Sequence, residues 1–341
     1  MEIVLYNRVC LYNEENNETI LYGQYNGKSF YDKENRIEDD KRRFKRIEIE
    51  DIKYKLVFND YRPDFYINFS GKISSINEIR FYYEENEIIK NDIIFYYPFE
   101  GCNFKLNKDT SAIISTYCKN YSHRLDEWIR YNLDLGFSGI VVFDNSENKS
   151  NNINESIEYG VFEDSIEDIC KRYIDKVVYI NYPYSPIKGY CHTHIQRISL
   201  HVGVNEFKSK CRNIALIDAD EFIYIPKDPS MKIEYFFQDY DTTITMRSNI
   251  LTNKNSDDII NNNVLKIAKY IGEDMYTKTI LKTDKIKYLE FINTPHKHYT
   301  QKILEKDTII HYHCWLNERC KYEDTMEKTD IFNHYINRFD D

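Results

Sequence analysis

The pattern of hydrophobic and polar positions along the chain changes near residue 109. Before this point, short segments rich in β-branched and aromatic residues alternate with turn-forming residues, which is typical of antiparallel strands. The clearest signal is Asn26-Gly27, which supplies the two positive φ angles of a tight hairpin turn between strands at 19–25 and 28–31. We expect residues 1–108 to form a β-rich domain or extension, with further strands at 53–58, 65–69, 79–83 and 93–97.

After residue 109, apolar runs of strand length alternate with segments of helical periodicity. Ser122 is the expected N-cap of an amphipathic helix that carries Trp128 on its apolar face and is closed by Gly136. Alternation of helices with strands rich in Ile and Val is typical of an α/β domain on a mostly parallel sheet. We expect this domain at 109–325, followed by a charged helical tail at 326–341. Its predicted strands are 112–117, 137–143, 176–181, 212–217, 242–247, 264–271, 278–282 and 308–312, with a helix at 191–210 and a polar loop at 249–263.

The stretch from Arg212 to Pro226, RNIALIDADEFIYIP, places three carboxylates between two apolar runs. The flanking runs favour burial, so Asp218, Asp220 and Glu221 are carried to the edge of a core. In an extended segment Asp218 and Asp220 point the same way, and neighbouring carboxylates repel one another unless a cation lies between them. Mg²⁺ and Mn²⁺ prefer such oxygen ligands and complete their shells with substrate phosphates. The pattern predicts a metal–diphosphate site, and the alternative is a structural acidic turn.

A second acidic position follows another predicted strand. Asp144 comes after the strand at 137–143, as Asp218 comes after the strand at 212–217. In open α/β sheets, ligands lie beyond the carboxyl ends of the strands. We therefore expect Asp144 and Asp218 to face the same crevice. The alternative for Asp144-Asn145-Ser146 is a turn that simply begins a loop.

Composition narrows the classes of partner. Of the 341 residues 42% are hydrophobic, enough for a sizeable core, and the net charge is −10. This charge argues against a nucleic-acid partner, which requires a basic surface. It also means that an anionic substrate must be met by a metal or a local basic pocket, because the overall field repels it.

Cysteine usage and the N-terminal segment bear on location. Eight cysteines occur without a C-x-x-C pair, which indicates reduced thiols in a cytoplasmic compartment. The start, MEIVLYNRVC, lacks the basic and apolar regions of a signal peptide. No apolar run approaches the roughly 20 residues that span a bilayer. We expect a soluble cytoplasmic protein without a transmembrane segment, at most peripheral to a membrane.

Taken in order, these segments resemble glycosyltransferases of the GT-A type, and most closely the family 92 group with its bacterial and viral relatives. The resemblance covers roughly residues 111–325. One position departs from the family pattern, since Tyr121 follows Lys119-Asn120 where the family has Glu. The elements that carry the resemblance are the strand 112–117, Glu127-Trp128-Ile129-Arg130-Tyr131, Gly136, Phe143-Asp144-Asn145-Ser146, Gln196, Asp218-Ala219-Asp220-Glu221-Phe222, Lys278-Thr279-Ile280, Pro295-His296 and Ile309-Ile310-His311-Tyr312.

The resemblance implies a GT-A, Rossmann-like fold and transfer of a sugar from a nucleotide-sugar donor to a glycan, glycoprotein or lipid-linked acceptor. Asp218 and Asp220 would hold Mn²⁺ or Mg²⁺ on the donor diphosphate. A late histidine completes the metal shell in many such enzymes, and His311, or else His296, would be that ligand. The remaining nucleotide-contacting residues implied are Tyr117, Asp144, Asn145 and Gln196, together with Arg197 and Lys278 at the diphosphate unless these two are only surface cations.

An inverting transferase also needs a base to accept the proton of the acceptor hydroxyl. Glu273-Asp274 is the carboxylate pair best placed along the sequence, although a solvated turn explains it as well. Glu221 is expected either to orient the metal shell or donor or to pair with a buried arginine. We expect Trp128 in the core, with Glu127 tying its helix to a loop.

Two other classes of function remain open. Six histidines form the H-x-H pairs His192/His194, His296/His298 and His311/His313, and such pairs on a strand could serve a hydrolase. A nucleotidyltransferase would use the same carboxylates. A non-catalytic glycan-binding protein is the other alternative, but the intact Asp218 and Asp220 count against it.

Overall fold

The computed structural model describes residues 2–26, 44–60, 62–146, 164–187, 191–255, 263–296, 301–314 and 322–336. The chain divides into two units, which we treat separately. The first unit comprises Met1–Cys102 with Asn181–Val202, and the second comprises Asn103–Ile180 with Gly203–Asp341. A segment that follows the first part of the α/β region thus groups with the N-terminal strands.

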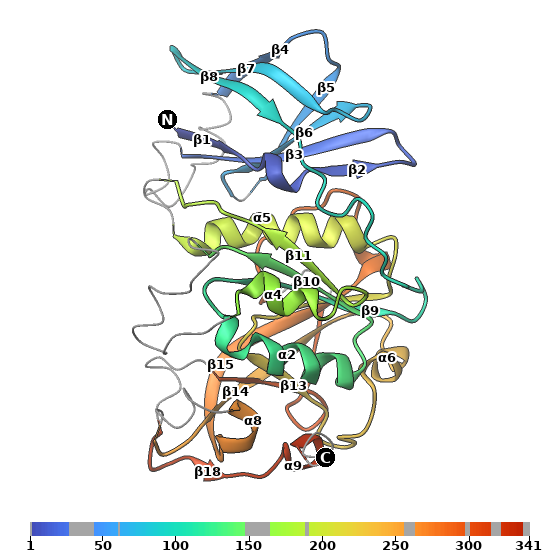
Figure 1. Cartoon of the computed structure of the whole chain (residues 1–341), viewed down its shortest axis with the longest axis vertical. Coiled ribbons are helices and arrows are strands. Elements are labelled where there is room, and N and C mark those ends of the chain that lie inside the picture. Colours follow the sequence, from blue (N-terminus) through green and yellow to red (C-terminus); the bar gives the residue numbers. More distant parts are fainter. Residues whose placement is uncertain are drawn as a thin grey trace. The chain divides into compact units, whose positions relative to one another are not determined.

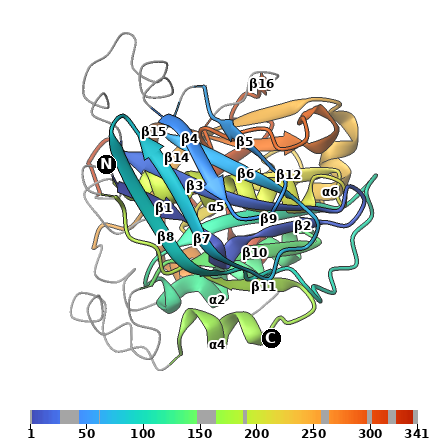
Figure 2. The same ribbon diagram turned by 90° about the horizontal axis from the view of Figure 1, so that it is seen from above.

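The first unit contains two antiparallel sheets (Figure 1, blue to cyan). Their strands pair as the alternation of the sequence predicts, and β7 and β8 run side by side in Figure 2. The five-stranded sheet has the order β1 (Glu2–Leu5), β3 (Glu18–Asn26), β6 (Asp64–Ser70) and β5 (Tyr54–Phe58), with β2 (Leu11–Asn13) on β3; the three-stranded sheet is β4 (Phe44–Ile49), β7 (Ser75–Tyr83) and β8 (Asn86–Ile94); a short 3₁₀ helix, η1 (Asn7–Val9), follows β1.

Aromatic rings fill the core of this first unit. Phe44 of β4 contacts Phe65 of β6 and Phe81 of β7, with ring centroids 6.3 and 5.9 Å apart. Gly23 lies against Phe65, since a Cβ atom at Gly23 would stand 2.3 Å from the ring. The observed strands cover the predicted segments at 53–58, 65–69 and 79–83. Of the strand predicted at 93–97, only residues 93 and 94 are in a strand, as the last two residues of β8. The turn and second strand of the predicted hairpin, at 27–31, lie outside the described residues.

The second unit is built on a ten-stranded mixed sheet. Its strand order is β11 (Val177–Asn181), β10 (Gly139–Asp144), β9 (Ala112–Cys118), β12 (Asn213–Leu216), β15 (Tyr270–Lys282), β14 (Thr243–Thr252), β17 (Ile310–His313) and β13 (Glu221–Tyr224), with β16 (Gln301–Ile303) on β14 and β18 (Glu327–Lys328) on β15. The helices of the remaining chain are α2 (Ser122–Leu135), α4 (Ile166–Lys171), α5 (His192–Phe207), α6 (Ile233–Phe236), α8 (Val264–Ile267) and α9 (Asn333–Ile336), with 3₁₀ turns η3 (Phe237–Asp239) and η4 (Thr283–Lys285).

The expectation of a mostly parallel sheet is wrong for this unit. Strands β10 and β12 both run parallel to β9, but β15 is antiparallel to β12 and to β14. Parallel neighbours require a long crossover, normally a helix, whereas antiparallel neighbours do not. Between β14 and β15 the described chain contains only the four-residue α8, where a strand at 264–271 was predicted. The fold class that stands is therefore mixed α/β.

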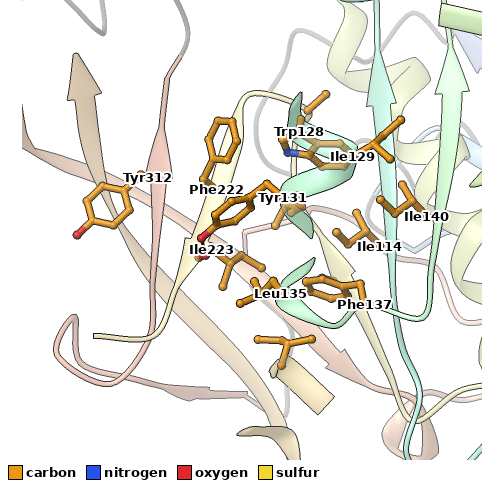
Figure 3. Packing of buried hydrophobic residues seen from close by; sticks show 14 of the residues in the cluster. Ile114, Trp128, Ile129, Tyr131, Leu135, Phe137, Ile140, Phe222, Ile223 and Tyr312 are labelled. Atoms are coloured by element: carbon orange, nitrogen blue, oxygen red, sulfur yellow. Dashed lines mark hydrogen bonds between the residues drawn. The ribbon is translucent and has the colours of Figure 1, made fainter. Parts of the chain in front are cut away.

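Helix α2 ends as predicted, with Gly136 at φ 104° closing it, but the prediction of Ser122 as its N-cap is wrong. Ser122 is its first helical residue, so Tyr121 takes the N-cap position. Trp128 is fully buried, and its indole Nε1 donates to the Glu221 carbonyl oxygen at 2.8 Å. Tyr131, one turn further, donates to the Ile223 carbonyl. Figure 3 shows these side chains meeting β13, so α2 fixes the strand that begins with Glu221.

Within the described residues, every helix is too short or too polar to cross a lipid bilayer. The charged segment after residue 325 contains β18 and the short α9, and 337–341 lie outside the described part.

Candidate metal centre

The three carboxylates of Asp218-Ala219-Asp220-Glu221 lie in the turn that joins β12 to β13. The turn closes on itself, because the Glu221 amide donates to the Asp218 carbonyl and the Asp218 amide donates to Glu221 Oε2, each at 3.1 Å. Asp220 and Glu221 are buried, whereas the Asp218 side chain is 37% exposed. The sequence prediction that an apolar strand carries these acids to the edge of a core agrees with this arrangement.

Strand β17 brings two histidines to these acids. It pairs antiparallel with β13, so that His313 stands opposite Glu221 and His311 opposite Ile223. The Nε2 atom of His313 lies 3.0 Å from Asp220 Oδ2, and the Cys314 amide donates to the Asp220 carbonyl at 2.9 Å. Both histidines are buried and lie on one face of the strand, since residues two apart share a face.

Asp220, Glu221 and His313 form a group that could hold a metal ion. Each offers one ligand atom, and these atoms lie within 4.8 Å of one another. Two carboxylate oxygens and one imidazole nitrogen suit a divalent cation, with further positions left for substrate or water. Of the ligands named from the sequence, Asp220 belongs to this group, while Glu221 was expected beside it and His313 was not selected.

Lys278 occupies the other side of the cluster. Its ammonium group, buried on β15, donates to Asp218 Oδ2 and lies 3.3 Å from Glu221 Oε2. Burial lowers the pKa of Lys278, but the charges of Asp218 and Glu221 outweigh it and hold that pKa above its ordinary value. The lysine is therefore an internal counter-ion. Asp218, which was predicted to be a metal ligand, does not belong to the three-residue group and instead pairs with Lys278.

Protons balance the rest of the negative charge. Burial, with repulsion from Asp218 and Asp220, raises the pKa of Glu221 to about 8 against the opposing effect of Lys278. Burial also lowers the pKa of His313, but Asp220 reverses this and raises it to about 9. A cation that binds this group must displace such protons, so metal and proton compete for the same atoms.

Asp274 lies on the far side of the His313 ring. Its Oδ2 lies 3.9 Å from His313 Nδ1 and accepts from the Ser248 hydroxyl at 2.7 Å. Its Oδ1 accepts from the amides of Met275 and Tyr276 at 2.7 and 3.3 Å. Of the three residues predicted to be catalytic, Glu221 and Asp274 thus lie at the cluster.

The third, Glu273, is exposed on β15 and has no contact with the cluster among the described atoms. It stands next to Asp274 along an extended strand, where neighbouring side chains point to opposite faces. The sequence pair Glu273-Asp274 is therefore split, with one carboxylate at the cluster and one at the surface.

The two histidines proposed as metal ligands lie close to this group without belonging to it. His311 is fully buried, with Nδ1 3.5 Å from Glu221 Oε1, and within the described chain neither ring nitrogen makes a hydrogen bond. Burial and the charge of Lys278 hold its pKa well below the ordinary value, so the ring is neutral. His296 Nδ1 lies 2.6 Å from the Thr277 carbonyl oxygen. An orphaned imidazole beside Glu221 is a further sign that this cluster suits a cation.

The carboxyl ends of β9 and β10 carry the residues expected at the nucleotide. The Tyr117 hydroxyl donates to Asn145 Oδ1 at 2.8 Å. Asp144 accepts from the Ser146 amide at 2.9 Å through Oδ1 and from the Tyr179 hydroxyl at 3.0 Å through Oδ2. The hydrogen bonds from Ser146 to Asp144 are those of a turn that begins a loop, which was the alternative interpretation of Asp144-Asn145-Ser146. Asp144 nevertheless lies at the carboxyl end of β10, where a ligand is expected.

Cys118 links this edge to the acidic turn. It ends β9, with β10 on one side and β12 on the other. Burial raises the pKa of its thiol well above the ordinary value, and the charges of Asp144 and Asp218 raise it further. Both carboxylates therefore lie near the same thiol, as expected if Asp144 and Asp218 face one region.

Gln196 and Arg197 lie in the part of α5 that belongs to the first unit. Arg197 is buried and donates through Nε and a terminal nitrogen to the fully buried Asp64, at 3.0 and 3.1 Å. It is thus neither a surface cation nor free to reach a diphosphate within its own unit. The Gln196 carbonyl accepts from the Ser199 hydroxyl. The local helical pattern gave no signal for Asp64, which lies far away in the sequence.

A scan against protein-family models and a search of curated proteins gave no significant match.

Proposed function

We propose that this protein is a divalent-cation-dependent glycosyltransferase that moves a sugar from a nucleotide-sugar donor to a hydroxyl of a glycan, glycoprotein or lipid-linked acceptor. The observation that carries the proposal is the buried group formed by Asp220 of the β12–β13 turn, Glu221 at the start of β13 and His313 of β17, beside Asp218. The sequence resemblance to GT-A enzymes of the family 92 type supplies the reaction class.

The parallel strands β10, β9 and β12 support a Rossmann-like, nucleotide-binding half of a GT-A fold within the mixed sheet. Tyr117, Asp144 and Asn145 stand at the carboxyl ends of these strands and would contact the nucleoside. For Asp144 this requires exchange of the bonds from Ser146 or Tyr179 for bonds to the ligand.

Asp220, Glu221 and His313 would hold Mn²⁺ or Mg²⁺. When bound, the cation would stabilise the negative charge that develops on the leaving nucleoside diphosphate. Lys278 neutralises part of the charge of Asp218 and Glu221, which reduces the repulsion that the same diphosphate would meet in a protein of net negative charge. His311 lies beside Glu221, with Nδ1 3.5 Å from Oε1, and its ring can direct a nitrogen toward the cation or its water.

Asp274 is the carboxylate that we assign as the base for the acceptor hydroxyl. It is held by three hydrogen bonds from neighbouring groups and lies next to His313. A carboxylate fixed in this way can accept a proton without reorganising.

The free cysteines of the described chain further support a reducing, cytoplasmic location.

A thermal-shift panel tests the proposal. The purified protein is heated with nucleoside diphosphates and nucleotide-sugars, each with Mn²⁺, with Mg²⁺ or with a chelator. A ligand that binds only the native state at about 100 times its Kd stabilises the protein by about 2.7 kcal/mol. We expect one nucleotide to raise the melting temperature only with the cation, and Asp220→Asn to abolish that shift. Indifference to every nucleotide would overturn the proposal.

A metal-dependent hydrolase is the second candidate, and the neutral buried His311 beside the group favours it. Two imidazoles and two carboxylates would suit Zn²⁺ with a bound water. In the same panel, a shift by Zn²⁺ alone, without any nucleotide effect, would favour this alternative. Nucleotidyl transfer would show as a shift by nucleoside triphosphates in preference to nucleotide-sugars, and a purely glycan-binding protein would ignore both.

A further inference from the structure

A cavity of about 630 Å³ with a mixed polar and apolar lining opens near the candidate metal centre in the second unit. Its walls come from Arg247 of β14, from residues 273–277 at the start of β15 and from residues 305–307 ahead of β17. The volume lies within the range of small-molecule ligand pockets. Asp274 lines this cavity and its Oδ2 lies 3.9 Å from His313 Nδ1, so one side chain separates the cavity from the metal group.

The charges around the cavity are mixed and slightly negative. Four carboxylates and two cations line it, and several of these are already paired. Arg247 lies 3.7 Å from Glu305, and Asp307 lies 3.1 Å from Lys227. Such a lining offers many hydrogen-bond donors and acceptors but no excess positive charge. It therefore suits a neutral ligand rich in hydroxyl groups and repels phosphate or carboxylate groups.

The cavity also carries exposed apolar surface. Met275 is 97% exposed and Tyr276 is 43% exposed, although both lie on the long strand β15. The C–H groups of a sugar ring carry partial positive charge and pack well on the negative face of an aromatic ring. A pyranose presents hydroxyl groups at its edge and C–H groups on its face. The charged side chains around the cavity suit the hydroxyl groups, and the exposed tyrosine suits the C–H face.

A local irregularity shapes this wall. The pairing of β14 with β15 shifts register between Arg247 and Asn249, and the side chain of the intervening Ser248 reaches Asp274 Oδ2 and the Tyr276 carbonyl. The bulge thereby fixes the carboxylate of Asp274 and the backbone of Tyr276 relative to each other. Bulges commonly re-aim side chains next to functional sites.

We propose that this cavity is the acceptor subsite and that it binds a neutral sugar, with Tyr276 stacking on the ring and Asp274 at the reacting hydroxyl. The proposal rests on the proposed function, since only transfer requires an acceptor next to the metal group. It names the acceptor as a carbohydrate and not as a serine or threonine of a polypeptide, because the exposed tyrosine offers a flat ring face and the rim offers paired charges.

Saturation-transfer NMR on the intact chain tests the subsite. The probes are the methyl glycosides of glucose, galactose, mannose and N-acetylglucosamine, with glucose 1-phosphate as the anionic counterpart and a serine- and threonine-rich peptide as the polypeptide counterpart. We expect at least one methyl glycoside to bind the wild-type protein, and Tyr276→Ala to weaken its binding by about tenfold, a loss expected from removing an aromatic anchor.

Tyr235→Ala is the matched control, because Tyr235 is 65% exposed on α6 and does not line the cavity. It should bind the same glycoside as the wild type does. The subsite is overturned if no methyl glycoside binds, if Tyr276→Ala binds as well as Tyr235→Ala, or if the peptide or the sugar phosphate binds in preference. If a glycoside binds through Tyr276 but no nucleotide shift is seen, the sugar site stands and the transferase proposal fails. If the nucleotide shift is seen without glycoside binding, the reverse holds.

Discussion

The imidazole of His313 lies between two carboxylates, with Nε2 3.0 Å from Asp220 Oδ2 and Nδ1 3.9 Å from Asp274 Oδ2. One ring therefore connects the acidic turn before β13 with the start of β15. The connection arises from the register of β17 on β13, which sets His313 opposite Glu221. A cation held by Asp220, Glu221 and His313 would have its imidazole ligand oriented by Asp274, and such outer partners tune metal affinity.

Replacement of Asp220 by asparagine should abolish metal-dependent binding while the fold persists. The amide keeps the shape of the side chain and can still bond His313, but it lacks the charge that attracts a cation. We expect Mn²⁺ affinity, measured by electron paramagnetic resonance of the free ion, to fall by more than about tenfold. Asp241→Asn serves as control, because the Asp241 side chain is 81% exposed and, among the described residues, pairs with Lys282 and Lys285 away from the metal group. Equal Mn²⁺ binding by both variants would exclude Asp220 as a ligand.

The two histidines of β17 can be distinguished by parallel substitutions. His313→Gln should weaken Mn²⁺ binding by at least about tenfold, because it removes a member of the group. His311→Gln should have a much smaller effect, since His311 lies behind Glu221. Each variant is compared at a temperature where circular dichroism shows it folded. A larger loss in His311→Gln would restore the ligand choice made from the sequence.

The residues that the sequence identified are those whose environment depends on local pattern. Helix α2 lies where predicted and ends at Gly136, because its apolar spacing and this glycine are local signals. Glu127 ties that helix to the start of α8, where a loop was expected, since it accepts from the amides of Val264 and Leu265 at 2.9 and 3.2 Å; this contact spans 137 residues and has no local signal. Asp144 and Asp218 follow strand ends at the same edge of the sheet, because β10 and β12 both run parallel to β9.

What the sequence missed depends on pairing between distant segments. Choosing between His311 and His313 requires the register of β17 on β13, and a strand pattern fixes which residues share a face but not which residue lies opposite which. The partner of Lys278 is 60 residues away, and the partner of Arg197 is 133 residues away. The antiparallel course of β14 and β15 likewise leaves no mark in their apolar runs, because both kinds of pairing bury such runs.

The first unit should lose stability on acidification. Asp64 is fully buried; burial raises its pKa, but Arg197 and His201 outweigh this and hold it below its ordinary value. Stability from this carboxylate is present above its unfolded pKa, about 3.9, and is lost as the pH falls toward the folded value. Burial also lowers the pKa of His201, so below about pH 6.5 the unfolded chain takes up a proton that the folded chain excludes. Both effects make the folded state less stable at lower pH.

Urea unfolding between pH 7.5 and 3 measures this dependence, with the contribution of Asp64 appearing below about pH 3.9. We expect the free energy of unfolding to fall from below about pH 6.5, with each such proton contributing up to about 1.4 kcal/mol per pH unit. Between about pH 6.5 and 5, His201→Gln should reduce the slope of the unfolding free energy against pH by up to the contribution of one proton. The rest of the slope comes from His194, whose pKa is lowered to about 4, and from the other buried histidines. An unchanged slope in His201→Gln would show that His201 does not contribute.

Replacement of Lys278 by methionine should destabilise the protein and make it more dependent on metal. The ammonium group is buried between Asp218 and Glu221, and removing one partner of a buried ion pair costs about 3–5 kcal/mol, less here because Asp218 is 37% exposed. A divalent cation at Asp220 and Glu221 would replace part of the lost positive charge. We therefore expect Mn²⁺ to raise the melting temperature of Lys278→Met by more than it raises that of the wild type. Lys285→Met, at a side chain 39% exposed, is the control and should respond to Mn²⁺ as the wild type does. A destabilised Lys278→Met that Mn²⁺ leaves unchanged would mean that the lysine and the cation do not share these carboxylates, and that Lys278 has only a structural role.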